Sequence, residues 1–146
     1  MNIFEALREE HEIQRKLLAT LINTSGETEK RDRTFKNLKN ELKIHADAEE
    51  KYFYVPLIES DKTQDKARHS IAEHHEIDEL IEELEAMEYS SSGWLKIAKT
   101  LQERVEHHLS EEEHEVFQMA GKVLSEDQKK KLAGNYKKHI NEYRYR

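Results

Sequence analysis

One stretch of the sequence decides the fold: residues 38–53, which read LKNELKIHADAEEKYF. Its apolar residues recur at spacings of three and four, which is typical of one face of an α-helix. His45 lies on that same face, because it follows Leu42 by three residues. Glu49 also lies there, four residues before Phe53. The stretch therefore predicts a helix that carries an imidazole and a carboxylate toward the protein interior.

The same pattern returns 63 residues later, in residues 101–116, which read LQERVEHHLSEEEHEV. The same offset also aligns residues 11–21 with residues 74–84, so that most of their leucine and isoleucine positions coincide. The aligned polar pairs are His11 with His74, His45 with His108, and Glu49 with Glu112. A repeat that includes helices and the loop between them predicts two similar helical hairpins, packed about a pseudo-twofold axis.

The rest of the chain fits an all-α protein. Among 146 residues there are only 4 Gly and 1 Pro, too few for the many tight turns of a β-sandwich. Periodicity predicts long helices at about 3–22, 30–58, 61–87 and 94–120. We expect Asp61 to cap the third of them, and Pro56 to kink or end the second. Short loops between long helices favour an up-down-up-down four-helix bundle.

A shorter fifth helix is expected after the bundle. Ser125 and Gln128 have the spacing of a capping box, which opens a helix. We therefore expect a single domain over residues 1–146, with the bundle at about 3–121 and the additional C-terminal helix at about 125–143.

Composition excludes several classes of function. The formal net charge of −7 argues against nucleic acid as a partner, because phosphate binding requires cations. The absence of Cys excludes disulfides, thiolate metal sites and iron–sulfur clusters. No segment approaches the length of a membrane span, and the N-terminal residues do not resemble a signal peptide. We therefore expect a cytoplasmic protein without a membrane partner.

Six polar residues are expected to meet inside the bundle: His11, His45, Glu49, His74, His108 and Glu112. Burying an unpaired ion costs several kcal/mol, and no matching Lys or Arg lies on the same faces. A metal centre removes this difficulty. Six ligands exceed the four of a structural zinc site, whereas calcium and magnesium prefer oxygen. Mixed imidazole and carboxylate ligands favour iron or manganese, and two carboxylates on opposite helices can bridge two ions.

The order of these residues resembles the hemerythrin-like domain, also called the HHE domain. The resemblance covers about residues 3–121 and includes the flanking residues 73–78, EHHEID. It implies a four-helix bundle around a non-haem di-iron centre with an oxo or hydroxo bridge. It also implies O2, NO or peroxide as the small-molecule partner. The four histidines would be terminal ligands, and Glu49 and Glu112 the bridging ones.

One position departs from the oxygen-carrying members of that family. They have a further histidine four residues after the ligand on the third helix, where this chain has Asp78. Asp78 could be a ligand, could hold a ligand by a hydrogen bond, or could leave a metal position open. An open position favours oxidation of the metal over reversible oxygen carriage.

Several functions stay open. A di-iron protein of this kind could act in sensing, in the stress response or in iron handling. An oxidase or a peroxidase-type enzyme on the same centre is the alternative, and manganese or zinc could replace iron. A metal-free interaction bundle and a ferritin-like site are further alternatives, although the latter requires Glu-x-x-His spacings that only Glu111 and His114 show. A protein partner or a homodimer is also compatible with the sequence.

The other histidines are not expected to be ligands. His75 and His107 fall off the apolar faces and are expected at the surface or just outside the ligands. The expected solvated histidines are His69, His114 and His139. Three aromatic residues near the two glutamates are expected to pack in the interior, although one of them could line an entry path to the site: Tyr52, Tyr54 and Phe117.

Overall fold

A computed structural model describes residues 1–145, and every regular element in that range is helical. The elements are α1 (Ile3–Ile22), α2 (Glu29–Glu49), η1 (Glu50–Tyr54), α3 (Val55–Ile58), α4 (Gln64–Glu85), α5 (Trp94–Glu111), η2 (Glu112–Val116), α6 (Phe117–Val123) and α7 (Glu126–Arg144). The elements η1 and η2 are single π-helical turns. Because no residue separates them from their neighbours, α2–η1–α3 and α5–η2–α6 are each helical without interruption. These two segments, together with α1 and α4, are called the four rods of the bundle.

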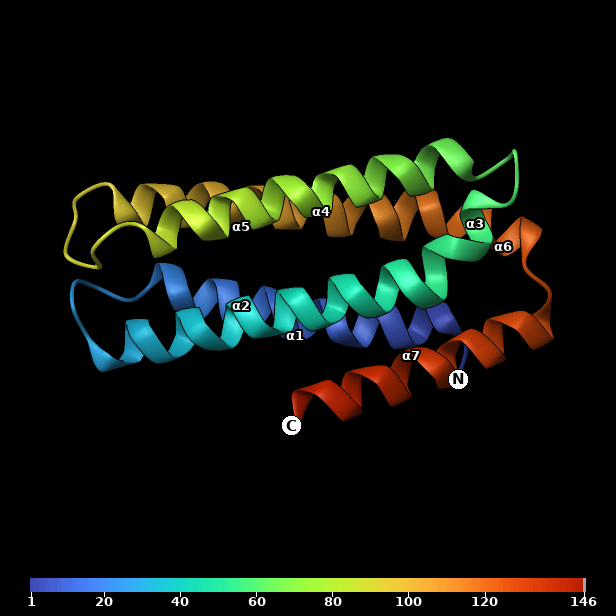
Figure 1. Cartoon of the computed structure of the whole chain (residues 1–146), viewed down its shortest axis with the longest axis horizontal. Coiled ribbons are helices and arrows are strands. Elements are labelled where there is room, and N and C mark those ends of the chain that lie inside the picture. Colours follow the sequence, from blue (N-terminus) through green and yellow to red (C-terminus); the bar gives the residue numbers. More distant parts are fainter. Residues whose placement is uncertain (146) are drawn as a thin grey trace.

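The rods form an antiparallel bundle (Figure 1). Helices α4 and α5 lie side by side, and α1 and α2 form the pair beneath them. Helix α7 lies outside the bundle, packed along α1 and α2. The expected all-α class, with a bundle and an additional C-terminal helix, is therefore confirmed. None of the helices within residues 1–145 is long and apolar enough to span a lipid bilayer.

The ends of the helices follow the sequence in most places. The Ser125 side chain accepts a hydrogen bond from the backbone N–H of Gln128, and the Gln128 side chain accepts one from the backbone N–H of Ser125. The predicted capping box of α7 is thus present. The prediction that Asp61 caps the third helix is wrong. This helix begins at Gln64, because residues 59–63 first form a turn in which the Thr63 hydroxyl donates to the carbonyl of Leu57.

The interior contains two separate hydrophobic clusters. One lies toward the loops that join α1 to α2 and α4 to α5, and it includes Phe35, Leu84 and Trp94. The other lies toward α3 and α6, and it includes Phe53 and Tyr136. The buried polar residues include the predicted histidines and glutamates, which lie between the two clusters. A polar layer therefore crosses the core between two apolar halves.

Candidate metal centre

A π-helical turn accompanies each of the two buried glutamates. Glu49 is the last residue of α2 and is followed directly by η1, whereas Glu112 is the first residue of η2. A π-turn inserts an extra residue into a helix and is frequent at functional sites. The two halves of the internal repeat therefore share a local distortion within one residue of the same place, where each carries its carboxylate inward.

The structure brings all six predicted residues together in the polar layer. Their exposed fractions are 0% for His11, 4% for His45, 0% for Glu49, 6% for His74, 2% for His108 and 1% for Glu112. They come from α1, α2, α4, α5 and η2, so every rod of the bundle contributes. The prediction that these residues share one interior site agrees with this arrangement.

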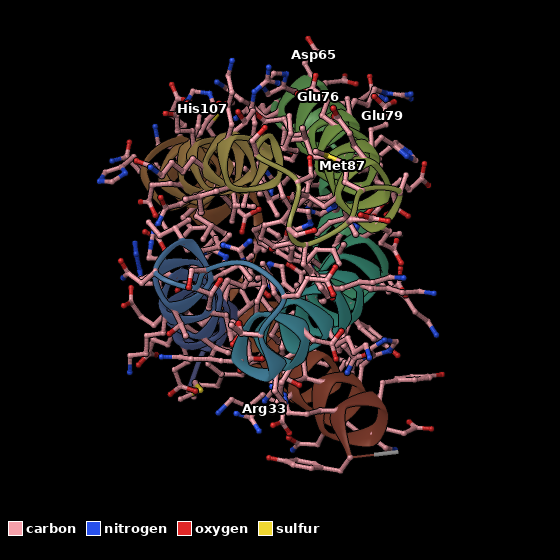
Figure 2. All side chains as sticks on the ribbon, turned by 90° about the vertical axis from the view of Figure 1, so that its left-hand side faces the viewer. Arg33, Asp65, Glu76, Glu79, Met87 and His107 are labelled. Carbon is pink, nitrogen blue, oxygen red and sulfur yellow. The ribbon has the colours of Figure 1, made fainter. Side chains whose placement is uncertain are left out.

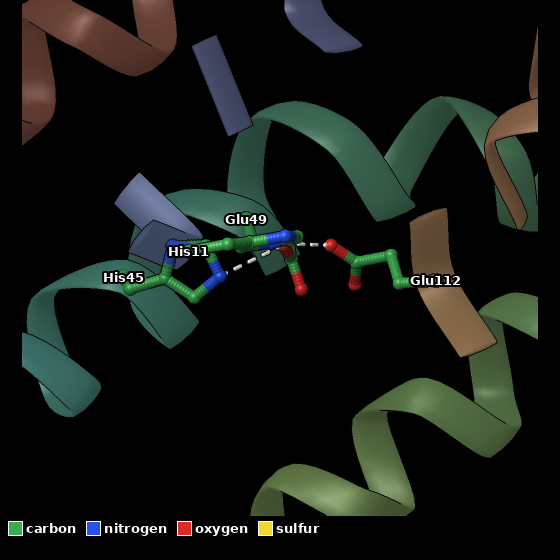
Figure 3. Close-up of side chains that lie close together, drawn as sticks. All are labelled: His11, His45, Glu49 and Glu112. Carbon is green, nitrogen blue, oxygen red and sulfur yellow. Dashed lines mark ion pairs between the residues drawn. The ribbon is translucent and has the colours of Figure 1, made fainter. Parts of the chain in front are cut away.

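The first of two groups contains His11 and His45 (Figure 3). The Nε2 atom of His45 lies 3.0 Å from Oε2 of Glu49, and Nε2 of His11 lies 3.9 Å from that same oxygen. Nε2 of His11 also lies 3.0 Å from Oε1 of Glu112. One oxygen of each carboxylate therefore faces this pair of imidazoles.

The second group contains His74 and His108. Their Nε2 atoms lie 3.2 Å and 3.8 Å from Oε1 of Glu49. Nε2 of His108 lies 3.6 Å from Oε2 of Glu112. The two Nε2 atoms are 3.0 Å apart, which is about the separation of two adjacent ligands on one ion at bond lengths near 2.1 Å. Each carboxylate thus has one oxygen toward each group, and the six residues outline two neighbouring cation positions.

The outer nitrogen of each histidine has its own partner. Nδ1 of His11 bonds to Glu113, that of His74 to Glu50 and that of His108 to Glu73, at 2.7 to 3.2 Å. Nδ1 of His45 lies 2.6 Å from the hydroxyl oxygen of Tyr136, on α7. Because an ionised carboxylate only accepts hydrogen bonds, the proton of a neutral ring sits on Nδ1 and leaves a lone pair on Nε2. This arrangement is typical of metal-binding histidines.

Several of the inner atoms lack hydrogen-bond partners. Within residues 1–145, Nε2 of His11, Nε2 of His45, both oxygens of Glu49 and Oε1 of Glu112 are buried and make no hydrogen bond. Buried polar atoms are rarely left in this condition, because each costs about 1–3 kcal/mol. Several lone pairs converge on the same space without donors between them. The residues present therefore fit bound cations.

Electrostatics leads to the same conclusion. Burial disfavours the charge on Glu49, but the surrounding imidazoles, led by His45, outweigh burial and hold the pKa of this carboxyl well below its usual value. Burial and the charge of Glu49 raise the pKa of Glu112. Burial lowers the pKa of His74 and His108, but nearby carboxylates raise it to about 9 and about 10. The site thus attracts positive charge, as protons or as metal ions that displace them.

Two further side chains, which the sequence analysis did not assign to the site, also reach it. Tyr54 was expected to pack or to line an entry path, and its hydroxyl donates to Oε2 of Glu112. Burial and the neighbouring carboxylates raise its pKa well above the usual value, so it stays a donor. The Nε2 of Gln14 is buried without a partner. Gln14 lines a cavity of about 10 Å³ beside His45 and His74, at the lower limit for one water molecule.

Other candidates lie outside the cluster. Asp78 is exposed at the rim of that cavity and belongs to neither buried group. His75 and His107 are exposed, as expected, and Figure 2 shows His107 on the outer surface of the bundle. His114 is also exposed, and its Nδ1 bonds to the backbone carbonyl of Ser110, so the ferritin-like alternative has no ligand there.

Replacing Tyr136 with Phe should weaken metal binding without unfolding the bundle. The substitution removes the hydroxyl that orients His45 while keeping the ring in the hydrophobic cluster. Loss of such an outer partner typically costs about 10–100-fold in metal affinity. Competition with a chromophoric chelator measures this affinity. The same substitution at Tyr145, which is 78% exposed, serves as the control and should leave the metal affinity unchanged.

Comparison with known proteins agrees with the geometry. The model of the Hemerythrin HHE cation binding domain matches residues 2–120. The crystal structure of a Hemerythrin HHE cation binding domain-containing protein from Mycobacterium kansasii superposes with a TM-score of 0.89 at 22% identity, over 99% of this chain and 88% of that one. No curated protein matches the sequence. The family match covers most of the chain and includes all six buried residues, so the chain belongs to the Hemerythrin HHE cation binding domain family.

Proposed function

We propose that this protein holds a non-haem di-iron centre that binds or reacts with a small oxidant or gas, such as O2, NO or peroxide, in sensing, stress response or iron handling. The observation that carries the proposal is the orientation of the four histidines, which bond outward through Nδ1 and leave Nε2 facing two shared carboxylates. His11, His45, His74 and His108 would be terminal ligands, and Glu49 and Glu112 would bridge. When bound, an iron pair supplies redox chemistry and coordination positions for such molecules.

The donor set supports two ions rather than one. Each histidine pair has one oxygen from Glu49 and one from Glu112 within 3.9 Å of at least one of its Nε2 atoms. Four protein donors per ion would leave positions free on an octahedral ion. Imidazole nitrogens in equal number to carboxylate oxygens favour iron over calcium or magnesium.

The surroundings favour a small reactant. The cavity beside His45 and His74 is about 10 Å³, which leaves no room for an organic substrate. Gln14 has an unpartnered buried N–H at that cavity, which can donate a hydrogen bond to a small ligand, and the Tyr54 hydroxyl donates to Glu112. An oxidase acting on a larger molecule is therefore less well supported than a binder of small molecules. A peroxidase-type activity stays the second candidate, because peroxide is small and the Gln14 amide can donate a hydrogen bond to it.

An anaerobic titration of the metal-free protein with ferrous iron tests the proposal. We expect saturation at two irons per chain, followed on exposure to air by charge-transfer bands of a bridged ferric pair. A stable adduct would indicate a binder or sensor, whereas turnover of added peroxide would indicate the enzyme. Saturation at one iron without such bands would contradict the dinuclear centre.

A further inference from the structure

Helices α4 and α5 carry a second pair of His-x3-Glu motifs outside the buried centre. His69 and Glu73 lie four residues apart on α4, and His107 and Glu111 lie four residues apart on α5. The buried motifs of α2 and α5 have this same spacing, which places both side chains on one face of a helix. On α5 the two motifs are offset by one residue, so one points into the core and the other toward the outer edge of α4.

The four side chains converge at the surface between the two helices. Nε2 of His69 lies 3.2 Å from Oε1 of Glu111 and 3.6 Å from Oε2 of Glu73. Nε2 of His107 lies 3.1 Å from Oε2 of Glu111 and 3.8 Å from that same Glu73 oxygen. Both rings therefore direct the same nitrogen at the same two carboxylates. Ligand atoms of His69, Glu73 and Glu111 lie within 4.8 Å of one another.

The carboxylates are better buried than the imidazoles. The side chains of Glu73 and Glu111 are 12% and 16% exposed, whereas those of His69 and His107 are 55% and 69% exposed. The two acidic groups thus lie between the helices, with two exposed imidazoles beside them. Two negative charges held together in this way attract a cation, and the imidazoles select for a transition metal.

We propose that His69, Glu73, His107 and Glu111 form a second site, which binds one first-row divalent cation at the protein surface. Two nitrogen and two oxygen donors suit Zn²⁺, Fe²⁺, Co²⁺ or Ni²⁺ rather than Ca²⁺ or Mg²⁺. Because the imidazoles are exposed, a cation bound at this site should exchange readily with cations in solution. The inference does not depend on the proposed di-iron centre, because none of the four residues is among its six proposed ligands.

The surface site contacts the buried centre through one residue. Oε2 of Glu73 faces the surface cluster, while its Oε1 accepts a hydrogen bond from Nδ1 of His108 at 2.9 Å. A cation on Oε2 withdraws negative charge from the carboxylate and weakens its hold on the His108 proton. Binding at the surface is therefore expected to shift the NMR signal of the His108 ring, even in protein whose buried site is already filled.

Titration of Zn²⁺ into protein already loaded with iron tests the site, with calorimetry as the readout. We expect one additional Zn²⁺ per chain in the natural sequence. The double variant His69→Ala and His107→Ala should lose this binding event or weaken it at least about tenfold, since both nitrogen donors are gone. The variant His75→Ala is the matched control, because it removes another exposed histidine of α4 and should bind as the natural protein does.

The variant Glu49→Gln distinguishes a failure of the surface site from a failure of the proposed buried centre. It alters the buried centre and should leave surface binding of Zn²⁺ intact. Equal Zn²⁺ binding by the natural sequence and the double variant would overturn the surface site, and would leave the contacts there as ordinary hydrogen bonds. If the double variant fails to fold, as judged by its helical circular dichroism, the single variant Glu111→Gln takes its place and carries the same expectation.

Discussion

Replacing Glu49 with glutamine is expected to abolish tight metal binding. Glu49 is fully buried and, like Glu112, has one oxygen toward each histidine pair. Glutamine has nearly the same shape but carries no charge, and its amide nitrogen cannot serve as a ligand. The loss of affinity should exceed the roughly 10–100-fold that follows removal of an outer partner. Elemental analysis of the purified variant, with the visible spectrum, measures this loss.

Glu83→Gln is the control for that experiment. Glu83 is an exposed carboxylate of α4, and its replacement should leave the metal content unchanged. A metal-free interaction bundle makes the opposite prediction for the core. Without a metal, removing a buried carboxylate should be neutral or stabilising, because its desolvation is costly. Full metal content in Glu49→Gln would therefore contradict the bridging role.

Removing the metal should lower the thermal midpoint of the protein by about 10–20 °C. A ligand at a hundred times its dissociation constant contributes about 2.7 kcal/mol to stability, and two ions would contribute twice that. For a chain of this size, 1 kcal/mol corresponds to about 2–4 °C. Chelator treatment followed by calorimetry measures the shift, and adding ferrous iron back under anaerobic conditions should reverse it. An unchanged midpoint would mean that the buried polar layer is stable without ions.

Helical periodicity was sufficient to predict the bundle and the six buried residues. The faces of residues 38–53 and 101–116 were unambiguous, because the histidine and glutamate of each continue an apolar row. The same reasoning placed His107 outside, since it lies about 100° from His108 on the helix. The capping box at Ser125 located the start of α7, because a cap is a local feature of a few residues.

The partners of the histidines could not be predicted in the same way. Glu50 and Glu113 directly follow the two buried glutamates, and Glu73 directly precedes His74, but such neighbours are common in a chain with 31 acidic residues. Tyr136 was missed because its contact with His45 depends on how α7 packs against α1 and α2, which is a matter of tertiary structure. The π-turns have no signal in the residue types. Asp61 was a plausible cap, but the turn before α4 is three residues longer than expected.

The polar layer divides the hydrophobic core into two clusters that belong to different ends of the bundle. Each end has its own loops and its own apolar cluster, so we expect each end to be able to unfold by itself when no ion is bound. Ions bound by residues from all four rods would link the two ends across this gap. Bound metal would then make the two ends unfold as one cooperative unit. In metal-free protein, the amide hydrogens of the end near Trp94 and of the end near Tyr136 should exchange at different rates.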